Sequence, residues 1–287
     1  MNILILGMGH IGKALATALR TQGHHVTGTT TTPEKVAILK EVADEVLVLT
    51  GADKDKVTAA ASKADKVIVT VAPNVRKTRS KEEREQHYHE VLELTCRHAT
   101  MACDQVLFAS SFSVYGDGGD GQAPIDEMTP TSNHQEPSSK YYQAAEQAIL
   151  SVSGGCVLRY PDMYGAPDDM DFPTRVKMAI DYFAGNAIFS ADAPLYAIHF
   201  EDVVASILHA VNKQLTGIYN VCDNDNVPFS NQQVFDAICA AHDWPKLTFL
   251  GQIKAPNRKI SADKLYNTGY RVEHSDPNRR WCEGASS

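Results

Sequence analysis

Several features that mark specialised classes of protein are absent from this sequence. The six cysteines include no C-x-x-C pair, so they support neither a zinc motif nor a disulfide framework. No apolar run approaches the roughly 20 residues that a membrane span requires. Basic residues are too few for a broad contact with nucleic-acid phosphates, because 27 Lys and Arg face 35 Asp and Glu, for a formal net charge of −8. We therefore expect a cytoplasmic protein with no membrane or nucleic-acid partner.

The composition is otherwise that of a globular chain. Hydrophobic residues make up 43% and charged residues 22% of the 287 residues, which is near the average for packed domains. At about 150 residues per domain, this length predicts roughly two units. The chain opens with Asn2-Ile3-Leu4-Ile5-Leu6 and no basic segment, which predicts a first strand rather than a signal peptide.

Short β-rich runs alternate with amphipathic helical stretches through the first part of the chain. We expect strands at residues 2–6, 25–29, 45–49, 66–71, 105–110 and 155–160. Helices are expected between them, at residues 11–22, 33–41, 53–63, 80–102 and 138–152. This alternation is typical of an α/β fold with a doubly wound parallel sheet, covered by helices on both faces.

A G-x-G-x-x-G motif at residues 7–12 links the first strand to the first helix. Gly7 permits a tight turn, Gly9 lets the backbone approach a pyrophosphate, and Gly12 lets the helix pack closely on the strand. The N–H groups at the start of the helix, near His10 and Ile11, add a partial positive charge. The motif in this context predicts a dinucleotide-binding site, and the alternative is a turn that is merely tight.

The end of the second strand bears on the choice of cofactor. A carboxylate there accepts hydrogen bonds from the ribose 2′-hydroxyl of NAD and would repel the 2′-phosphate of NADP. This chain has Thr29, Thr30 and Thr31 there instead, followed by Glu34, its first acidic residue, and by Lys35. The hydroxyls and the lysine favour NADP over NAD, and the alternative for the threonines is a hydroxyl-capped turn.

The end of the fourth strand is expected to lie along the cofactor. Val71, Ala72 and Pro73 come at the edge of the sheet that also carries the glycine turn, so we expect them beside the ribose. The basic residues that follow precede a charged helix, which predicts a solvated face, with contact to an anionic substrate as the alternative. They are Arg76, Lys77 and Arg79.

The pattern changes after Tyr160, where loops rich in Asp, Pro and Gly separate shorter elements. We expect a strand leading into a helix at 198–207, a strand at 217–221 and a helix at 231–242. Residues 1–165, with a returning segment near 195–222, are expected to form an NAD(P)-binding Rossmann domain. Residues 166–194 and 223–287 are expected to form a smaller lobe that binds the substrate.

Four further segments carry a family resemblance. They are A-S-S-F-S-V-Y-G at 109–116, R-Y-P-D-M-Y-G at 159–165, I-H-F-E-D at 198–202 and I-Y-N-V at 218–221. With the glycine motif, they make the chain resemble the extended short-chain dehydrogenase/reductases, the family of NAD-dependent epimerases and dehydratases. The resemblance covers nearly the whole chain and implies a Rossmann fold with hydride chemistry.

The resemblance also implies roles for individual residues. In this family a Ser or Thr orients the substrate, and a tyrosine whose pKa is lowered by a lysine four residues later exchanges the proton. Ser111 matches the first role, and the end of a strand is where open α/β sheets place ligands. The alternative is that Ser111 and its serine neighbours cap a turn. Asp162 would contact the substrate, and Pro161 would contact the nicotinamide amide or simply end a strand.

The Tyr-x-x-x-Lys pair of the family is missing. When Ala145-Glu146-Gln147 is aligned with the family's A-E-Q stretch, Ser138 stands where the tyrosine is expected and Tyr142 where the lysine is expected. Lys140 lies ~200° around the helix from Tyr142, so the two are not expected to share a face.

Three hypotheses follow from that gap. Tyr142 is the acid of a rewired enzyme, although without a neighbouring ammonium its phenol would titrate near the ordinary value of ~10. Alternatively Asp162 or Tyr164 supplies the acid or base, or the protein binds the cofactor without hydride chemistry. The leading hypothesis is an NAD(P)-dependent oxidoreductase or epimerase that acts on a small hydroxylated or carbonyl substrate. A homodimer through the helices at 80–102 and 138–152 is an analogy to relatives.

The remaining polar residues are given structural roles. Arg159 lies inside an apolar strand and is expected to form an ion pair. His87 and His89 are two residues apart on an expected helix and point to different faces, so they predict no metal site. His199 and Asp202 come where a strand meets a helix, which predicts orientation and capping, with a pocket contact as the alternative.

Overall fold

The structure is a computed structural model that describes residues 1–74 and 78–283; Arg76 and Lys77 lie outside the described residues. The chain divides into two compact units. The first consists of Met1–Val114, His134–Arg159 and Val204–Tyr219, and the second of Tyr115–Asn133, Tyr160–Val203 and the chain from Asn220 on.

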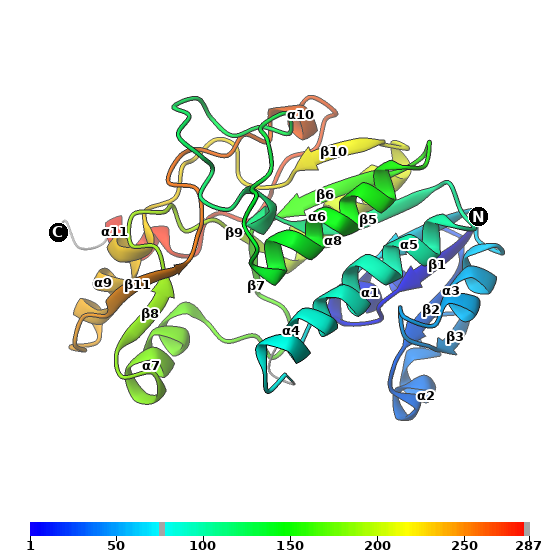
Figure 1. Cartoon of the computed structure of the whole chain (residues 1–287), viewed down its shortest axis with the longest axis horizontal. Helices are drawn as coiled ribbons and strands as arrows, with labels where there is room; N and C mark the ends of the chain where they lie inside the picture. Colours follow the sequence, from blue (N-terminus) through cyan, green and yellow to red (C-terminus); the bar gives the residue numbers. More distant parts are fainter. Residues whose placement is uncertain (75–77, 284–287) are drawn as a thin grey trace. The chain divides into compact units, whose positions relative to one another are not determined.

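A seven-stranded sheet forms the first unit, in the order β10-β6-β5-β4-β1-β2-β3 (Figure 1). Its strands are β1 (Asn2–Leu6), β2 (His25–Thr30), β3 (Glu45–Val48), β4 (Lys66–Val69), β5 (Val106–Ser111), β6 (Cys156–Tyr160) and β10 (Gly217–Asn220). Parallel pairing is recorded for β1 with β2 and β4, for β2 with β3, and for β4 with β5. The predicted α/β fold with a doubly wound sheet is confirmed.

Helices cover both faces of this sheet because its central strands are apolar on both sides. On one face, Leu4 and Leu6 of β1 share a core with buried side chains of α3 (Lys54–Ala61), α5 (Thr95–Thr100) and α6 (Pro137–Leu150). Side chains alternate along a strand, so Ile5 faces the other way. There it lies against α1 (His10–Thr21), close to Gly12.

The helix expected at 80–102 is interrupted. It consists of α4 (Lys81–Tyr88), a π-helical turn (His89–Leu94) and α5. Ser80 caps its start, because its hydroxyl accepts a hydrogen bond from the Glu83 N–H at 3.1 Å. The helix expected at 33–41 is split into a 3₁₀ turn (Pro33–Lys35) and α2 (Val36–Leu39).

The second unit contains two small parallel sheets. In one, β7 (Asp162–Tyr164) pairs with β9 (Ala197–His199) and sets Tyr164 opposite His199. In the other, β8 (Asn186–Phe189) pairs with β11 (Thr248–Ile253). Its helices are α7 (Phe172–Tyr182), α9 (Asn231–Ala241), α10 (Asp263–Tyr266), α11 (Arg279–Glu283) and the start of α8 (Phe200–Asn212).

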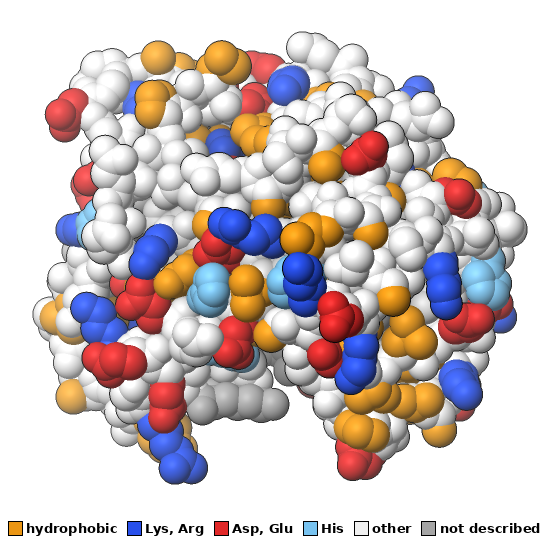
Figure 2. Space-filling view, turned by 45° about the vertical axis from the view of Figure 1, so that its right-hand side comes forward, with side chains coloured by type: hydrophobic (Ala, Val, Ile, Leu, Met, Phe, Trp, Pro, Cys, Tyr) orange, Lys and Arg blue, Asp and Glu red, His pale blue; other side chains and the backbone are white. Residues whose placement is uncertain are grey.

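The surface in Figure 2 has Lys and Arg side chains interspersed with Asp and Glu side chains. Some charged side chains of the first unit form ion pairs, for example Arg84 with Glu136 at 2.7 Å. Within the described ranges, no helix is both long enough and apolar enough to cross a membrane.

Candidate functional site

The glycine turn follows β1 and is fixed by two neighbouring strands. The Gly7 N–H donates to the Thr29 hydroxyl at 3.0 Å, and the Thr70 hydroxyl donates to the Gly7 carbonyl at 2.8 Å. Gly7 has φ +105°, a conformation that residues with a Cβ rarely adopt. A Cβ on Gly12 would lie only 2.2 Å from the Gly7 carbonyl oxygen. These two glycines are therefore needed for the turn itself.

Gly9 differs from both because nothing lies where its side chain would be. A Cβ at this position would meet no atom within 4 Å, and the backbone there is extended at φ −75°. Gly9 is also the N-cap of α1, whose first turn has no side-chain cap and no acidic residue. The N–H groups of His10, Ile11 and Gly12 thus begin a helix that is open to an anion, as a pyrophosphate site requires.

The threonines after β2 divide into two groups. Thr29 is buried and its hydroxyl supports Gly7, so it shapes the turn. The Thr30 hydroxyl accepts from the Thr32 N–H at 3.1 Å, as in the predicted hydroxyl-capped turn. Thr31 and Lys35 are exposed. No carboxylate stands at the end of this strand.

Val71 follows β4, which ends at Val69 rather than at the expected residue 71, and Ser111 ends β5; both lie on the same edge of the sheet as the glycine turn. A Cβ on Gly7 would lie 3.0 Å from Val71, and the register of β4 with β5 pairs Val69 with Phe108. The Ser111 hydroxyl accepts from the Ser113 N–H at 3.1 Å, so it does cap a turn. A hydroxyl also has a proton to donate, so this bond is compatible with a contact to a ligand.

Ser110, the residue before Ser111, belongs to a buried polar network. Glu146 of α6 accepts two bonds from the Arg159 guanidinium, at 2.9 and 2.6 Å, and one from the Ser110 hydroxyl at 2.6 Å. All three side chains are buried. The expected ion pair of Arg159 is confirmed, and the network joins α6 to β6 and, through Ser110, to β5, which ends at Ser111.

Helix α6 brings Ser138 and Tyr142 to one side, one turn apart. The Ser113 hydroxyl donates to the Ser138 carbonyl at 3.4 Å, so Ser138 lies beside the turn that follows Ser111. The Tyr142 ring stacks on Phe108, with 6.0 Å between centroids. The Tyr142 ring therefore lies against β5 at a residue that precedes Ser111 by three positions, or about 10 Å at ~3.3 Å per residue.

Lys140 is engaged elsewhere on the helix. Its ammonium pairs with Glu85 of α4 at 2.6 Å, and the Tyr141 hydroxyl donates to the same carboxylate oxygen at 3.1 Å. The bond from Lys140, with that from Tyr141, lowers the pKa of Glu85. The expectation that Lys140 and Tyr142 do not share a face agrees with this arrangement.

The predicted residues that follow β6 belong to the second unit. Pro161 separates β6 from β7, and Asp162 begins β7, where burial raises the pKa of its carboxyl. The Tyr164 hydroxyl donates to the Ser275 carbonyl at 3.0 Å, and burial raises the pKa of its phenol to about 12. A phenol with so high a pKa is a poor proton exchanger at neutral pH, so Asp162 is a better candidate than Tyr164 for this role.

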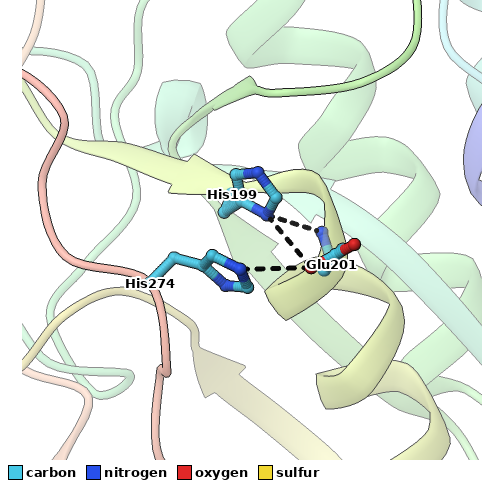
Figure 3. Close-up of side chains that lie close together, drawn as sticks. All are labelled: His199, Glu201 and His274. Carbon is cyan, nitrogen blue, oxygen red and sulfur yellow. Dashed lines mark hydrogen bonds and ion pairs between the residues drawn. The ribbon is translucent and has the colours of Figure 1, made fainter.

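The structure brings together a group of side chains that the sequence did not connect (Figure 3). His199, Glu201 and His274 place one nitrogen or oxygen each within 4.8 Å of the others. The His199 Nδ1 accepts from the Glu201 N–H at 3.2 Å, so the predicted capping role of His199 is confirmed. Burial and the His274 ring lower the pKa of His199.

Asp202 has a different function from the capping that was expected. Its buried carboxylate accepts from the N–H groups of Glu273 and His274, at 2.9 and 3.1 Å, and contacts His274 Nδ1 at 3.0 Å. It therefore fastens a segment 72 residues later to the start of α8. No local sequence signal links two positions so far apart.

Comparisons with known proteins agree with the fold. The chain is 27% identical to the protein YeeZ of Escherichia coli strain K12 over 229 residues, which cover 77% of each chain. It resembles the Bordetella bronchiseptica enzyme WbmG solved with NAD, with a TM-score of 0.74, 18% identity, and coverage of 99% of this chain and 93% of that one. For a UDP-glucuronic acid 4-epimerase of Bacillus cereus solved with NAD, the TM-score is 0.73 at 18% identity, covering 96% and 95% of the two chains.

At this level of identity the solved structures establish a shared fold. The family assignment comes from the sequence profile of the NAD dependent epimerase/dehydratase family, which matches residues 3–222. That range includes the glycine turn, Ser111 and the segment after β6. The chain therefore belongs to the NAD dependent epimerase/dehydratase family.

Proposed function

We propose that this protein binds NAD(P) and acts as an oxidoreductase or epimerase on a small hydroxylated or carbonyl substrate. The observation that carries the proposal is the open space at Gly9, directly before the uncapped N-terminus of α1. Gly7 and Gly12 are explained by the packing of the turn. At Gly9 the missing side chain leaves the backbone open to an approaching ligand, as a pyrophosphate site requires in this motif.

The residues around the turn fit the rest of such a cofactor. The N–H groups of His10, Ile11 and Gly12 would hold the pyrophosphate, and Val71, Ala72 and Pro73 would lie beside the ribose. Pro161 would contact the nicotinamide amide, as the family resemblance implies. When bound, the cofactor would supply a hydride acceptor or donor.

The choice between the two nicotinamide cofactors is part of this proposal. Thr31 and Lys35 are exposed after β2, and no carboxylate is there to repel a 2′-phosphate. Both cofactors are compatible with this surface, and its hydroxyl and ammonium groups favour NADP.

The chain's own chemistry centres on Ser111. Its hydroxyl would orient the substrate hydroxyl or carbonyl, and Tyr142 or Asp162 would exchange the proton. Tyr142 extends from the helix that lies beside the Ser111 turn, whereas Asp162 follows β6. A homodimer through the helix at residues 80–102 and α6 stays a prediction, which sedimentation velocity would check.

A second candidate function is NAD(P)-responsive binding without hydride transfer. The observation that favours it is Ser138, which stands beside the Ser111 turn where the family has its tyrosine, while the Lys140 ammonium is held by Glu85. A serine hydroxyl without a nearby ammonium is a poor proton exchanger at neutral pH.

Hydride exchange with each nicotinamide cofactor, measured over a panel of sugars, keto acids and hydroxy acids, separates the two functions. For an enzyme, we expect turnover that Ser111→Ala reduces by at least about 100-fold, the usual scale for a positioned catalytic group. If Tyr142 is the acid, Tyr142→Phe abolishes turnover and leaves cofactor affinity within a few-fold. Asp162→Asn tests the other candidate. Tight cofactor binding without turnover on any substrate, and no effect of Ser111→Ala, would contradict the enzymatic function.

A further inference from the structure

We propose that His199, Glu201 and His274 form a binding site for one divalent transition-metal ion of the zinc type. The three ligand atoms lie within 4.8 Å of one another, and all three residues belong to the second unit (Figure 3). His199 ends β9, Glu201 is in the first turn of α8, and His274 comes from the segment that Asp202 holds.

Asp202 holds one nitrogen of the His274 ring. Its carboxylate is almost fully buried and accepts the Nδ1–H of His274 at 3.0 Å, besides two backbone N–H groups. A neutral ring that donates from Nδ1 carries its lone pair on Nε2. A carboxylate behind a ligating histidine is the usual support of a zinc ligand.

The atom opposite that lone pair is itself an acceptor. Glu201 Oε2 lies 3.1 Å from His274 Nε2. Two acceptors at this distance repel each other unless a proton or a cation lies between them. A metal ion satisfies both atoms, and the carboxylates of Glu201 and Asp202 balance its two positive charges.

His199 supplies the third ligand, from the end of β9. Its Nδ1 is 3.9 Å from the same Glu201 oxygen, and a Cβ on Gly165 would lie 2.4 Å from its Nε2. The Nε2 edge therefore packs against Gly165, and Nδ1 faces the cluster. The ion would replace the Glu201 N–H as the partner of Nδ1.

A rotation of the imidazole rings accompanies ligation. The rings of His199 and His274 stack with 3.8 Å between centroids and 20° between planes. An imidazole lone pair lies in the plane of its ring, so two stacked rings aim at one ion only after they turn about their Cβ–Cγ bonds. Both rings are partly exposed, at 20% and 36%, which leaves room for this movement.

The donor set indicates the class of ion. Two imidazoles and one carboxylate suit zinc and its neighbours, whereas magnesium and calcium prefer oxygen ligands throughout. Glu201 is 67% exposed, so water or an oxygen of a small molecule can take a fourth position. The ion would join β9, α8 and the segment at His274.

The test uses the full chain, stripped of metal and freed of any purification tag. Zinc is titrated in competition with a chromophoric chelator, with magnesium in a parallel arm. We expect one zinc per chain and no magnesium binding at equal concentration. Glu201→Gln, an exposed change that leaves the fold intact, should weaken zinc binding at least about 10-fold, and His199→Ala with His274→Ala should abolish it.

Matched controls are His24→Ala and Glu45→Gln, both in the first unit. They should leave zinc affinity unchanged. Zinc should also raise the melting temperature of the wild-type chain and of these controls, but not that of the double histidine variant, because an ion that binds only the folded state stabilises it. Absence of zinc binding, or binding that Glu201→Gln and the double histidine variant leave unchanged, would overturn the proposal.

Discussion

Gly9 and Gly12 are three residues apart in the same motif, and substitution by Ala should affect a different property at each: cofactor binding at Gly9 and stability at Gly12. In Gly12→Ala, the new Cβ meets the Gly7 carbonyl oxygen at 2.2 Å, more than 1 Å inside an ordinary contact. Such overpacking costs about 1–3 kcal/mol, and the better helix propensity of Ala returns at most about 1 kcal/mol. We expect a loss of about 1–2 kcal/mol in the free energy of unfolding.

Gly9→Ala should leave stability almost unchanged and impair binding. Its Cβ meets no protein atom within 4 Å, and its φ of −75° is one that residues with a Cβ adopt. The free energy of unfolding should change by less than about 1 kcal/mol, the scale of an N-cap substitution. The methyl group enters the space assigned to the pyrophosphate, so NAD(P) affinity should fall at least about tenfold, or about 1.4 kcal/mol.

Urea unfolding followed by circular dichroism measures the free energy of unfolding of each variant, and calorimetric titration with the cofactor measures its NAD(P) affinity. The two variants are each other's controls, because they add the same methyl group three residues apart. Wild-type cofactor affinity in Gly9→Ala, or a loss of stability in Gly9→Ala as large as in Gly12→Ala, would contradict these expectations.

Three further predictions concern residues of the first unit. Glu146→Gln leaves the buried Arg159 guanidinium without a counter-charge and should cost about 3–5 kcal/mol in the free energy of unfolding, measured in urea. Glu146→Leu combined with Arg159→Met should recover much of that loss. A loss below about 1 kcal/mol in Glu146→Gln would contradict this prediction. The hydrogen bond from the Val26 N–H lowers the pKa of Asp44, so this group stabilises the fold above its unfolded pKa and the contribution is lost as the pH falls through the lower folded value. Asp44→Asn should therefore cost about 1 kcal/mol near neutral pH and little in acid, and an equal cost at both would count against the assignment. Thr31→Asp places a carboxylate after β2 and should weaken NADPH binding more than NADH binding, with calorimetry on both cofactors as the check and equal losses as the contrary result.

The first unit could be predicted closely because its signals are local. Strand β1 has the bounds expected from its apolar run, and the glycine turn lies between it and α1 as the motif requires. The π-helical turn at His89–Leu94 was not predicted, because the spacing of apolar residues is nearly the same in an α-helix that contains one extra residue in a turn.

The second unit depends on contacts between distant parts of the chain. Strand β7 is three residues long and, among the residues that the structure describes, pairs with β9, so composition alone did not identify it. The same holds for the cluster at His199, where the partner His274 is brought in by Asp202. Sequence motifs identified polar residues of the first unit such as Ser111, whereas the cluster of His199, Glu201 and His274 was found only through the fold.

The central claim is that the turn at residues 7–12 binds the pyrophosphate of a nicotinamide cofactor. Calorimetric titration of the wild-type chain with NAD, NADH, NADP and NADPH in turn tests it most directly. We predict one bound cofactor per chain for at least one of the four, with ADP-ribose as a competitor because it carries the same pyrophosphate. The absence of binding by all four at about 1 mM, a concentration that detects even weak sites, would contradict the claim.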